Sequence, residues 1–295
     1  MHIGEKIKAL RQSKLMTQAE LAGNQITRNM LSSIEHGTAL PSLPTAIYIA
    51  QRLNVPLGYL LAQEGDELAY RKMTAMPNIR HAFAAGDYAG ALSLIQAAQG
   101  AGEDDELSFL RAQCEFGIAR NDLCEGRLRS AVAALDRALA AAARTIYDTA
   151  WLRARSAVYF RYLSAVSATL SSDVLDADEI ENARALGDDI CEYVMALEGV
   201  ERGYKGAIDE YVARHPGSPY AARLQTLALM RQEDYSAALA MLEELLPRED
   251  LTFGVLLYDV FGDMELCCRK NDDYKRAYEF AGSRLGLLER MLEEL

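Results

Sequence analysis

The chain has 295 residues, of which 50% are apolar and only seven are proline, which excludes a disordered protein and leaves room for one to three globular domains. Its five cysteines contain no C-x-x-C pair, which argues against a disulfide framework or a zinc site, and no segment reaches the roughly 18–20 apolar residues of a membrane span. The formal charge is −12, but residues 1–63 sum to +3 and the remainder to −15. We therefore expect a soluble cytoplasmic protein with a basic head, suited to phosphates, on an acidic body.

Short amphipathic helices fill the first 61 residues. Apolar residues at helical spacing predict a first helix over residues 3–10 and a fourth over 43–53. Between them, Thr17 and Thr27 can cap two short helices predicted over residues 16–22 and 27–35, and Pro56 opens a short fifth helix. The packing residues predicted for the fourth helix are Leu43, Ile47, Ala50 and Leu53.

The second and third of these helices, joined by a tight Gly23-Asn24 turn, predict a helix-turn-helix whose second helix enters the major groove of DNA. In that helix Leu31 and Ile34 face inward. Arginine and asparagine in its exposed first turn are the side chains that make bidentate contacts to guanine and adenine. The residues predicted to contact DNA are Thr17, Gln18, Thr27, Arg28, Asn29, Ser32 and Ser33, with base contacts expected from Arg28, Asn29 and Ser33. Glu35 is predicted to be structural, closing on a neighbouring helix.

Residues 3–61 resemble the five-helix domain of Cro and the phage repressors, the XRE-type helix-turn-helix. The motifs that carry the resemblance are Met16-Thr17-Gln18, Leu21-Ala22, Leu31-Ser32, Ile34-Glu35-x-Gly37, Pro41-Ser42-Leu43 and Leu53-Asn54-Val55-Pro56. Three residues separate Ala22 from Ile26, where most such domains have four. The shorter turn resembles the peptide-sensing regulators of the RRNPP group (Rgg and PlcR types), which join this domain to tetratricopeptide repeats.

From residue 67 onward an aromatic–alanine step recurs at turns between predicted helices. It occurs at Tyr88, Tyr204, Tyr235 and Tyr274, each followed three residues later by alanine, with a weaker copy at Leu128. The step resembles the turn of a tetratricopeptide repeat, and its spacing brackets that repeat's period of about 34 residues. Helices over 146–170 and 177–198 are expected to fill the long gap in the series. The predicted fold is all-α: a helix-turn-helix domain at 1–66 and a tetratricopeptide-like α-solenoid at 67–295.

The first helix of each repeat is expected to line a concave groove. The predicted ligand residues are Trp151, Arg155, Tyr159, Tyr220 and Arg223, because aromatic and arginine side chains on one face are typical of peptide recognition. Counting back from the last turn also places Asp259 on this surface. The alternative is that these residues pack between repeats, with arginines that extend their charged ends to solvent.

The C-terminal helix predicts self-association. Leu288, Met291, Leu292 and Leu295 lie at helical spacing with no later segment to cover them, whereas a terminal repeat normally has a polar outer face. We therefore expect a homodimer formed through the C-terminal repeats.

No catalytic pattern is visible: the four histidines are scattered, and neither G-x-S-x-G nor a phosphate-binding loop occurs. We expect no enzyme, no metal site and no cofactor. The leading hypothesis is a transcriptional regulator that binds a palindromic operator in double-stranded DNA and whose repeat domain binds a peptide or protein ligand. The alternative is a tetratricopeptide adaptor that docks a protein partner, with DNA binding secondary. A phosphatase of a response regulator, like the Rap members of the RRNPP group, is disfavoured by the intact helix-turn-helix.

Overall fold

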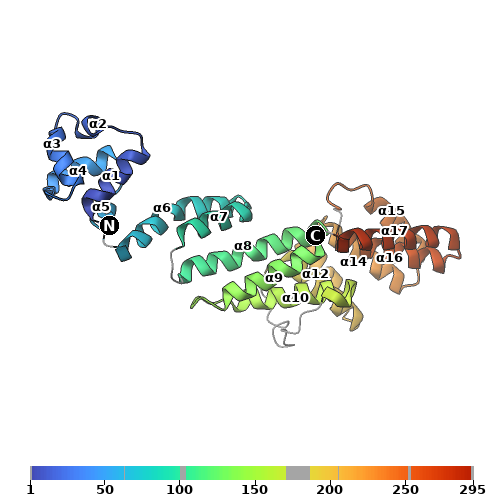
Figure 1. The fold of residues 1–295 in the computed structure, drawn as a ribbon. Coiled ribbons are helices and arrows are strands. Elements are labelled where there is room, and N and C mark those ends of the chain that lie inside the picture. The colour runs from blue at the N-terminus through green and yellow to red at the C-terminus, as the bar shows by residue number, and fades with distance from the viewer. Residues whose placement is uncertain are drawn as a thin grey trace. The chain divides into compact units, whose positions relative to one another are not determined.

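The computed structural model describes residues 2–62, 64–99, 104–170, 187–204, 206–251 and 254–293. All regular structure in these ranges is helical, as the sequence predicts, and they contain no strand (Figure 1). The helices form two compact units, Met1–Glu103 and Asp104–Leu295. None of the helices in these ranges combines the length and the apolar character that crossing a bilayer requires. All five cysteines are free thiols.

The five predicted head helices are present around a single apolar core that includes the fully buried Ile7, Leu31 and Ile34. The helices are α1 (Ile3–Ser13), α2 (Gln18–Ala22), α3 (Arg28–Glu35), α4 (Leu43–Arg52) and α5 (Leu57–Leu61).

The prediction for the inward face of α4 is partly wrong. Ala50 and Leu53 are buried as predicted, but Leu43 is 61% exposed and Ile47 39% exposed. Ile49 is fully buried and takes part in the head core instead. The buried face of α4 therefore centres on Ile49 and not, as predicted, on Leu43 and Ile47. This face packs against α2 and α5.

Two further helices complete the first compact unit: α6 (Glu64–Ala84) and α7 (Tyr88–Ala98), which pack against each other. The domain boundary predicted between residues 66 and 67 falls within the first turn of α6, and it stays a prediction. Helix α6 also contacts α5 of the head, where the hydroxyl of Tyr70 occupies the space that a side chain on Gly58 would need.

The second compact unit consists of helix pairs. Its elements are α8 (Asp105–Cys124), α9 (Leu128–Ala142), α10 (Ala150–Val166), the 3₁₀ turn η1 (Ala168–Leu170), α12 (Asp189–Glu201), α13 (Ala207–Arg214), α14 (Pro219–Arg231), α15 (Tyr235–Leu245), α16 (Val255–Lys270) and α17 (Tyr274–Glu293). Helix α10 lies within the helix predicted over 146–170. Helix α12 overlaps the C-terminal part of the helix predicted over 177–198, whose residues 177–186 lie outside the described residues.

The aromatic–alanine steps mark the turns between paired helices, as predicted. Helices α7, α9, α15 and α17 begin at the aromatic or leucine position of the step, and all five of its alanines are buried. The residue one or two places before that position has a left-handed backbone in every copy, which closes the preceding helix and reverses the chain. Three copies use glycine there, whereas Glu233 (φ 62°) and Asp272 (φ 59°) adopt the same conformation with a side chain.

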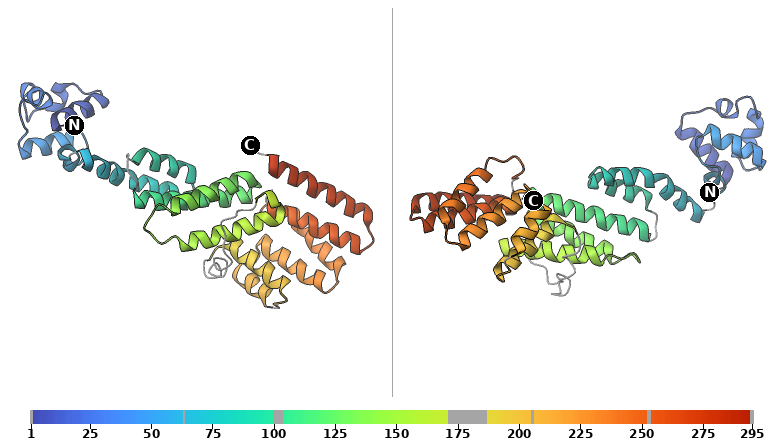
Figure 2. Two further views of the ribbon diagram at one scale, coloured as in Figure 1. Left: turned by 60° about the horizontal axis from the view of Figure 1, so that its bottom comes forward. Right: turned by 180° about the vertical axis from the view of Figure 1, so that it is seen from behind.

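The last helix pair, α16–α17, packs back onto the pair α8–α9. The prediction that the apolar face of the C-terminal helix is uncovered is therefore wrong. Helix α17 contacts α9, and α16 contacts α8 (Figure 2). Met291 and its neighbour Leu287 are fully buried in the core shared with α9, while Leu288 and Leu292 are partly buried against that core. Leu295 lies outside the described residues. The contact to α8 depends on Gly254, where a Cβ atom would lie 2.6 Å from the backbone oxygen of Cys124.

Candidate functional site

The α2–turn–α3 segment is built by local hydrogen bonds that its sequence encodes. The Thr17 hydroxyl accepts from the amide of Glu20 (3.2 Å), whose carboxylate accepts from the Thr17 amide (2.7 Å), so the two residues form a capping box at the start of α2. The Thr27 hydroxyl caps α3 by accepting from the amide of Met30 (3.1 Å). The turn is supported from α4, since the Tyr48 hydroxyl donates to the Ala22 carbonyl (3.0 Å).

Helix α3 presents the predicted contact residues on the side opposite its core residues. Arg28 and Asn29 are exposed in the first turn, and Ser32 and Ser33 are half-buried one turn later. Thr17 and Thr27 are exposed at the helix starts, and Gln18 is half-buried. This arrangement leaves the donor and acceptor groups of Arg28 and Asn29 open to a partner, while the buried residues hold the helix in place.

Glu35 joins three elements of the head at the end of α3, as predicted for a structural residue. Its carboxylate accepts two hydrogen bonds from the Arg11 guanidinium (2.7 and 3.0 Å) and one from the Gln18 amide (2.9 Å). Burial by itself would raise the pKa of Glu35, but these bonds and the Arg11 charge outweigh it and lower the pKa. The side-chain nitrogen of Gln18 donates to Glu35, and Glu35 also holds α3 against α1 through Arg11. The same hydrogen bonds therefore orient the Gln18 side chain.

Two basic side chains of α1 that could have reached phosphates are engaged inside the head. Arg11 pairs with Glu35 and also donates to the Met16 carbonyl (2.8 Å). Lys6 is buried and donates to the carbonyls of Tyr59 (3.4 Å) and Ala62, at the end of α5. The exposed Lys8 and Lys14 keep their side chains in solvent.

In the second compact unit, a partly buried polar network crosses the first helices of successive pairs. Arg223 of α14 donates to Asp259 (2.9 Å) and to Asp263 (2.7 Å) of α16. It also donates to the Tyr193 hydroxyl of α12, while the Tyr162 hydroxyl of α10 donates to Asp259 (3.1 Å). Burial raises the pKa of Asp259 more than the Arg223 charge lowers it. We call these residues the Arg223 network.

The five predicted ligand residues have different surroundings. Tyr159 is fully buried, and its hydroxyl donates to Asp188 (3.3 Å), the cap of α12. Trp151 and Arg155 are half-buried, with the guanidinium 5.1 Å from the indole centroid. Tyr220 is half-buried against Tyr193 (ring centroids 4.6 Å apart), and Arg223 is buried. The ligand groove therefore stays a prediction, and two of its five residues are enclosed within the unit.

Of the residues in the Arg223 network, Asp259 is predicted from the sequence, whereas Tyr193 and Asp263 are not. Asp259 and Asp263 lie four residues apart on α16, a spacing that puts both carboxylates on one helix face. A pair of acidic residues on the face that also carries apolar packing residues is the signal that could have revealed them. Tyr193 carries no comparable signal, because its burial depends on contacts with α10 and α14.

Comparisons with known proteins agree with this geometry in the head. A helix-turn-helix family matches residues 7–60, so the N-terminal domain is a helix-turn-helix domain. A search of curated proteins found no match.

Three solved structures align over nearly the whole chain at low identity. Bacillus thuringiensis PlcR in complex with the peptide PapR7 and DNA is 16% identical, with 99% of each chain covered and a TM-score of 0.26. ComR from S. thermophilus in complex with DNA and its signalling peptide ComS is 17% identical, with 97% of this chain and 99% of that chain covered and a TM-score of 0.25. The competence regulator ComR from Streptococcus vestibularis in complex with its cognate signaling peptide XIP is 18% identical, with 97% and 98% covered and a TM-score of 0.24.

Proposed function

We propose that this protein is a sequence-specific DNA-binding transcriptional regulator whose repeat domain binds a peptide or protein ligand and thereby controls operator binding. The observation that carries the proposal is the amphipathic character of α3. Its apolar side is fully buried in the head core at Leu31 and Ile34, and its first turn exposes Arg28 and Asn29. This is the arrangement that a recognition helix needs to enter the major groove.

The test begins with capture of genomic DNA by the intact chain, which supplies the operator. Arg28→Ala and Asn29→Ala should each reduce discrimination at one base pair by about 1–3 kcal/mol without changing the fold. Arg28→Lys is the matched control, because lysine keeps the charge but not the bidentate geometry. It should retain salt-dependent, non-specific binding and lose discrimination at the same base pair as Arg28→Ala. If all three variants bind the captured operator like the wild type, the assignment of α3 is wrong.

The proposed regulator is a homodimer, because a helix-turn-helix protein usually reads two half-sites about 34–36 Å apart. With Met291 and Leu287 covered by α9, the support for self-association comes from other residues of α17. Tyr274, Tyr278 and Leu285 share one side of this helix and are 65%, 82% and 58% exposed. Tyr278→Glu should lower the mass measured by sedimentation from dimer to monomer. A monomeric wild type at micromolar concentration would contradict the proposal.

Ligand control in this proposal acts through the contacts between helix pairs. The Arg223 network joins α10, α12, α14 and α16, so any change in the angle between these pairs must break or rearrange its hydrogen bonds. A ligand that prefers one arrangement shifts the balance by its differential affinity, typically about 1–3 kcal/mol. Operator affinity measured with and without extract from the native culture tests this coupling, and an unchanged affinity would count against it.

A further inference from the structure

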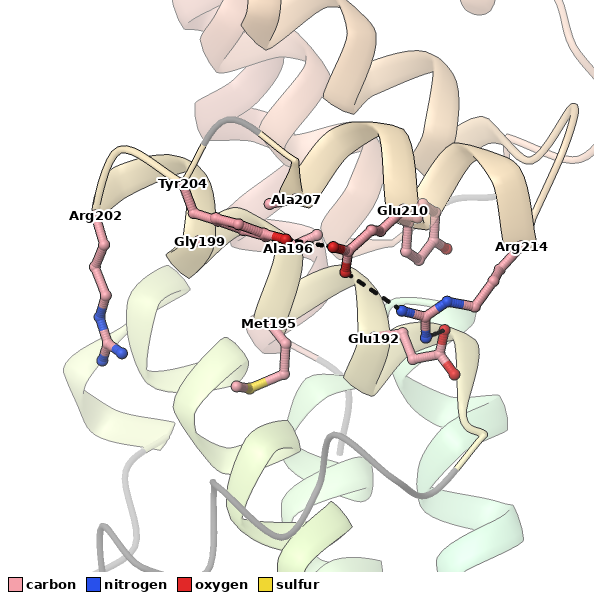
Figure 3. A pocket seen from close by; sticks show the side chains of 10 residues that line it. Glu192, Met195, Ala196, Gly199, Arg202, Tyr204, Ala207, Glu210 and Arg214 are labelled. Atoms are coloured by element: carbon pink, nitrogen blue, oxygen red, sulfur yellow. Dashed lines mark hydrogen bonds and ion pairs between the residues drawn. The ribbon is translucent and has the colours of Figure 1, made fainter.

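The helix pair α12–α13 borders an open cavity whose lining residues belong neither to α3 nor to the Arg223 network. Its volume is about 370 Å³, within the range of small-molecule sites, and it lies between the two helices of the pair (Figure 3). The floor is apolar and is made by Met195, Ala196, Gly199, Ala207 and Tyr211. Cavities of about 150 Å³ with apolar walls bind benzene, so this one has room for an aromatic ring and a linked polar group.

The turn at this cavity differs from those of the α6–α7 and α14–α15 pairs, and among the described tyrosines of these turns only Tyr274, in the last pair, is comparably exposed. Tyr88 and Tyr235 begin their helices and are half-buried against neighbouring apolar side chains. Tyr204, the corresponding residue here, precedes α13, which starts only at Ala207, and its side chain is 54% exposed. The Tyr204 ring instead lies over Gly199 at the rim of the cavity, and the space between the helices remains open.

A row of polar side chains crosses the mouth of the cavity. The Tyr204 hydroxyl donates to Glu210, whose second carboxylate oxygen lies 3.8 Å from Arg214. Arg214 donates to Glu192 (2.8 Å), which also contacts His215 (3.0 Å). Figure 3 shows Tyr204 and Arg214 on either side of Glu210.

Among the residues that the structure describes at this mouth, Glu210 is the carboxylate whose charge is least compensated. Its short-range partner among them is the neutral phenol of Tyr204, and Arg214 lies closer to Glu192 than to Glu210. The other arginine of the lining, Arg202, pairs with Glu198 (3.6 Å) and points away from Glu210 in Figure 3. The acidic excess of the chain after residue 63 adds a long-range field that attracts cations.

We propose that this cavity binds an amphipathic cation: an apolar group of about the size of one aromatic ring on the floor, and an ammonium or guanidinium on Glu210. The positive group takes the place of the Tyr204 hydroxyl, which swings into solvent. Both a small-molecule amine and the first residue of a peptide with a free amino terminus have this chemistry. The site goes beyond the proposed function, since binding here does not require that the chain bind DNA.

The test uses the full-length chain with ¹³C-methyl methionine and follows the Met195 signal, assigned through Met195→Leu. Benzylamine, benzyl alcohol and phenylacetate share one ring and differ in charge. Benzylamine should give a saturable shift with about tenfold higher affinity than benzyl alcohol, as expected for one charge-assisted contact, and phenylacetate should bind weakest. Equal binding of the three compounds, or no saturable shift of Met195, would overturn the proposal.

Variants separate the roles of the two mouth residues. Glu210→Gln should reduce benzylamine affinity to that of benzyl alcohol while leaving benzyl alcohol binding unchanged, which also shows that the cavity is intact. Tyr204→Phe removes the competing hydroxyl and should strengthen benzylamine binding severalfold. Glu201→Gln, an exposed charge of α12 outside the lining, is the matched control and should have little effect. Benzylamine binding that survives Glu210→Gln would show that Glu210 does not hold the cation.

The two sources of the ligand are distinguished with the tripeptide amide Phe-Gly-Gly and its N-acetylated form. A peptide source predicts that the free form binds more tightly than benzylamine and that acetylation abolishes the gain. If the free tripeptide binds no better than benzylamine, the site takes a small amine. If neither the tripeptide nor benzylamine moves the Met195 signal, the assignment fails, whatever the outcome of the DNA experiments.

Discussion

Two buried clusters of arginine and carboxylate, one in each compact unit, differ in their ratio of charges. In the head, Arg11 forms an ion pair with one carboxylate, that of Glu35, and the pKa of Glu35 is lowered although burial opposes this. In the second unit, Arg223 is shared by Asp259 and Asp263, and burial raises the pKa of Asp259. In the head, the hydrogen bonds from Arg11 and Gln18 outweigh the burial of Glu35, whereas burial and the neighbouring Asp263 charge outweigh the favourable partners of Asp259.

The largest effect is expected from Arg223→Met. The substitution leaves the half-buried Asp259 and Asp263 without their cation, and we expect a loss approaching the roughly 3–5 kcal/mol that an uncompensated buried charge costs. Urea unfolding of the full chain, followed by the fluorescence of Trp151, reports on the second unit. Arg214→Met is the control, because Arg214 is 54% exposed and an exposed pair contributes about 0–1 kcal/mol. Similar losses in the two variants would mean that the Arg223 network is not the stronger contact.

A smaller loss is expected from Glu35→Gln in the head. The glutamine can still accept hydrogen bonds, but the Arg11 charge loses its partner, and we expect a loss of about 1–3 kcal/mol. Hydrogen exchange of the Leu31 and Ile34 amides measures the effect within α3. Gln18→Ala removes one of the three hydrogen bonds to Glu35 and should give a smaller change. If the exchange rates of the Leu31 and Ile34 amides are unchanged in Glu35→Gln, then Glu35 does not hold α3 in place.

Asp259→Asn tests the effect of placing two carboxylates, Asp259 and Asp263, around the single Arg223 guanidinium. The amide oxygen can still accept from Arg223 and Tyr162, while one of two neighbouring negative charges disappears. We expect stability at neutral pH to stay within about 1 kcal/mol of the wild type or to increase, since removing a poorly compensated buried charge is often neutral or favourable. A loss as large as that of Arg223→Met would show that the two aspartates are fully compensated.

The smallest effects are expected in the pH dependence, with opposite signs in the two units. Glu35 has a lowered folded pKa, so its contribution is present above its unfolded pKa near 4.5 and is lost as the pH falls through the folded value. Asp259 has a raised folded pKa, so its contribution is present below its unfolded pKa near 3.8 and is lost as the pH rises through the folded value. Lowering the pH should therefore decrease the free energy of unfolding of the wild type relative to Glu35→Gln and increase it relative to Asp259→Asn. Unfolding curves of the three proteins from pH 3 to 7 measure both differences. Two differences of the same sign would contradict the opposite pKa shifts of Glu35 and Asp259.

The sequence predicted the parts of the fold that depend on contacts between near neighbours. Thr17 and Thr27 cap helices because their hydroxyls reach amides only three residues away. The aromatic–alanine steps mark the turns because a left-handed residue and a small buried alanine are both local requirements. For the same reason α3 could be oriented correctly, since the head is small and only one side of this helix meets a core.

The accessibility of polar residues in the repeats could not be predicted in the same way. Each first helix has neighbours on two sides, so a stripe that reads as solvent-exposed can be enclosed by helices far away in the chain. Arg223 is buried against α12 and α16, Tyr159 packs against α8 and the cap of α12, and the apolar end of α17 is covered by α9. Amino-acid spacing therefore determined the helices, their caps and the solvent-exposed side of α3. Packing between distant segments decided which side chains of the repeats remain open to a ligand, because burial depends on neighbours that local sequence does not specify.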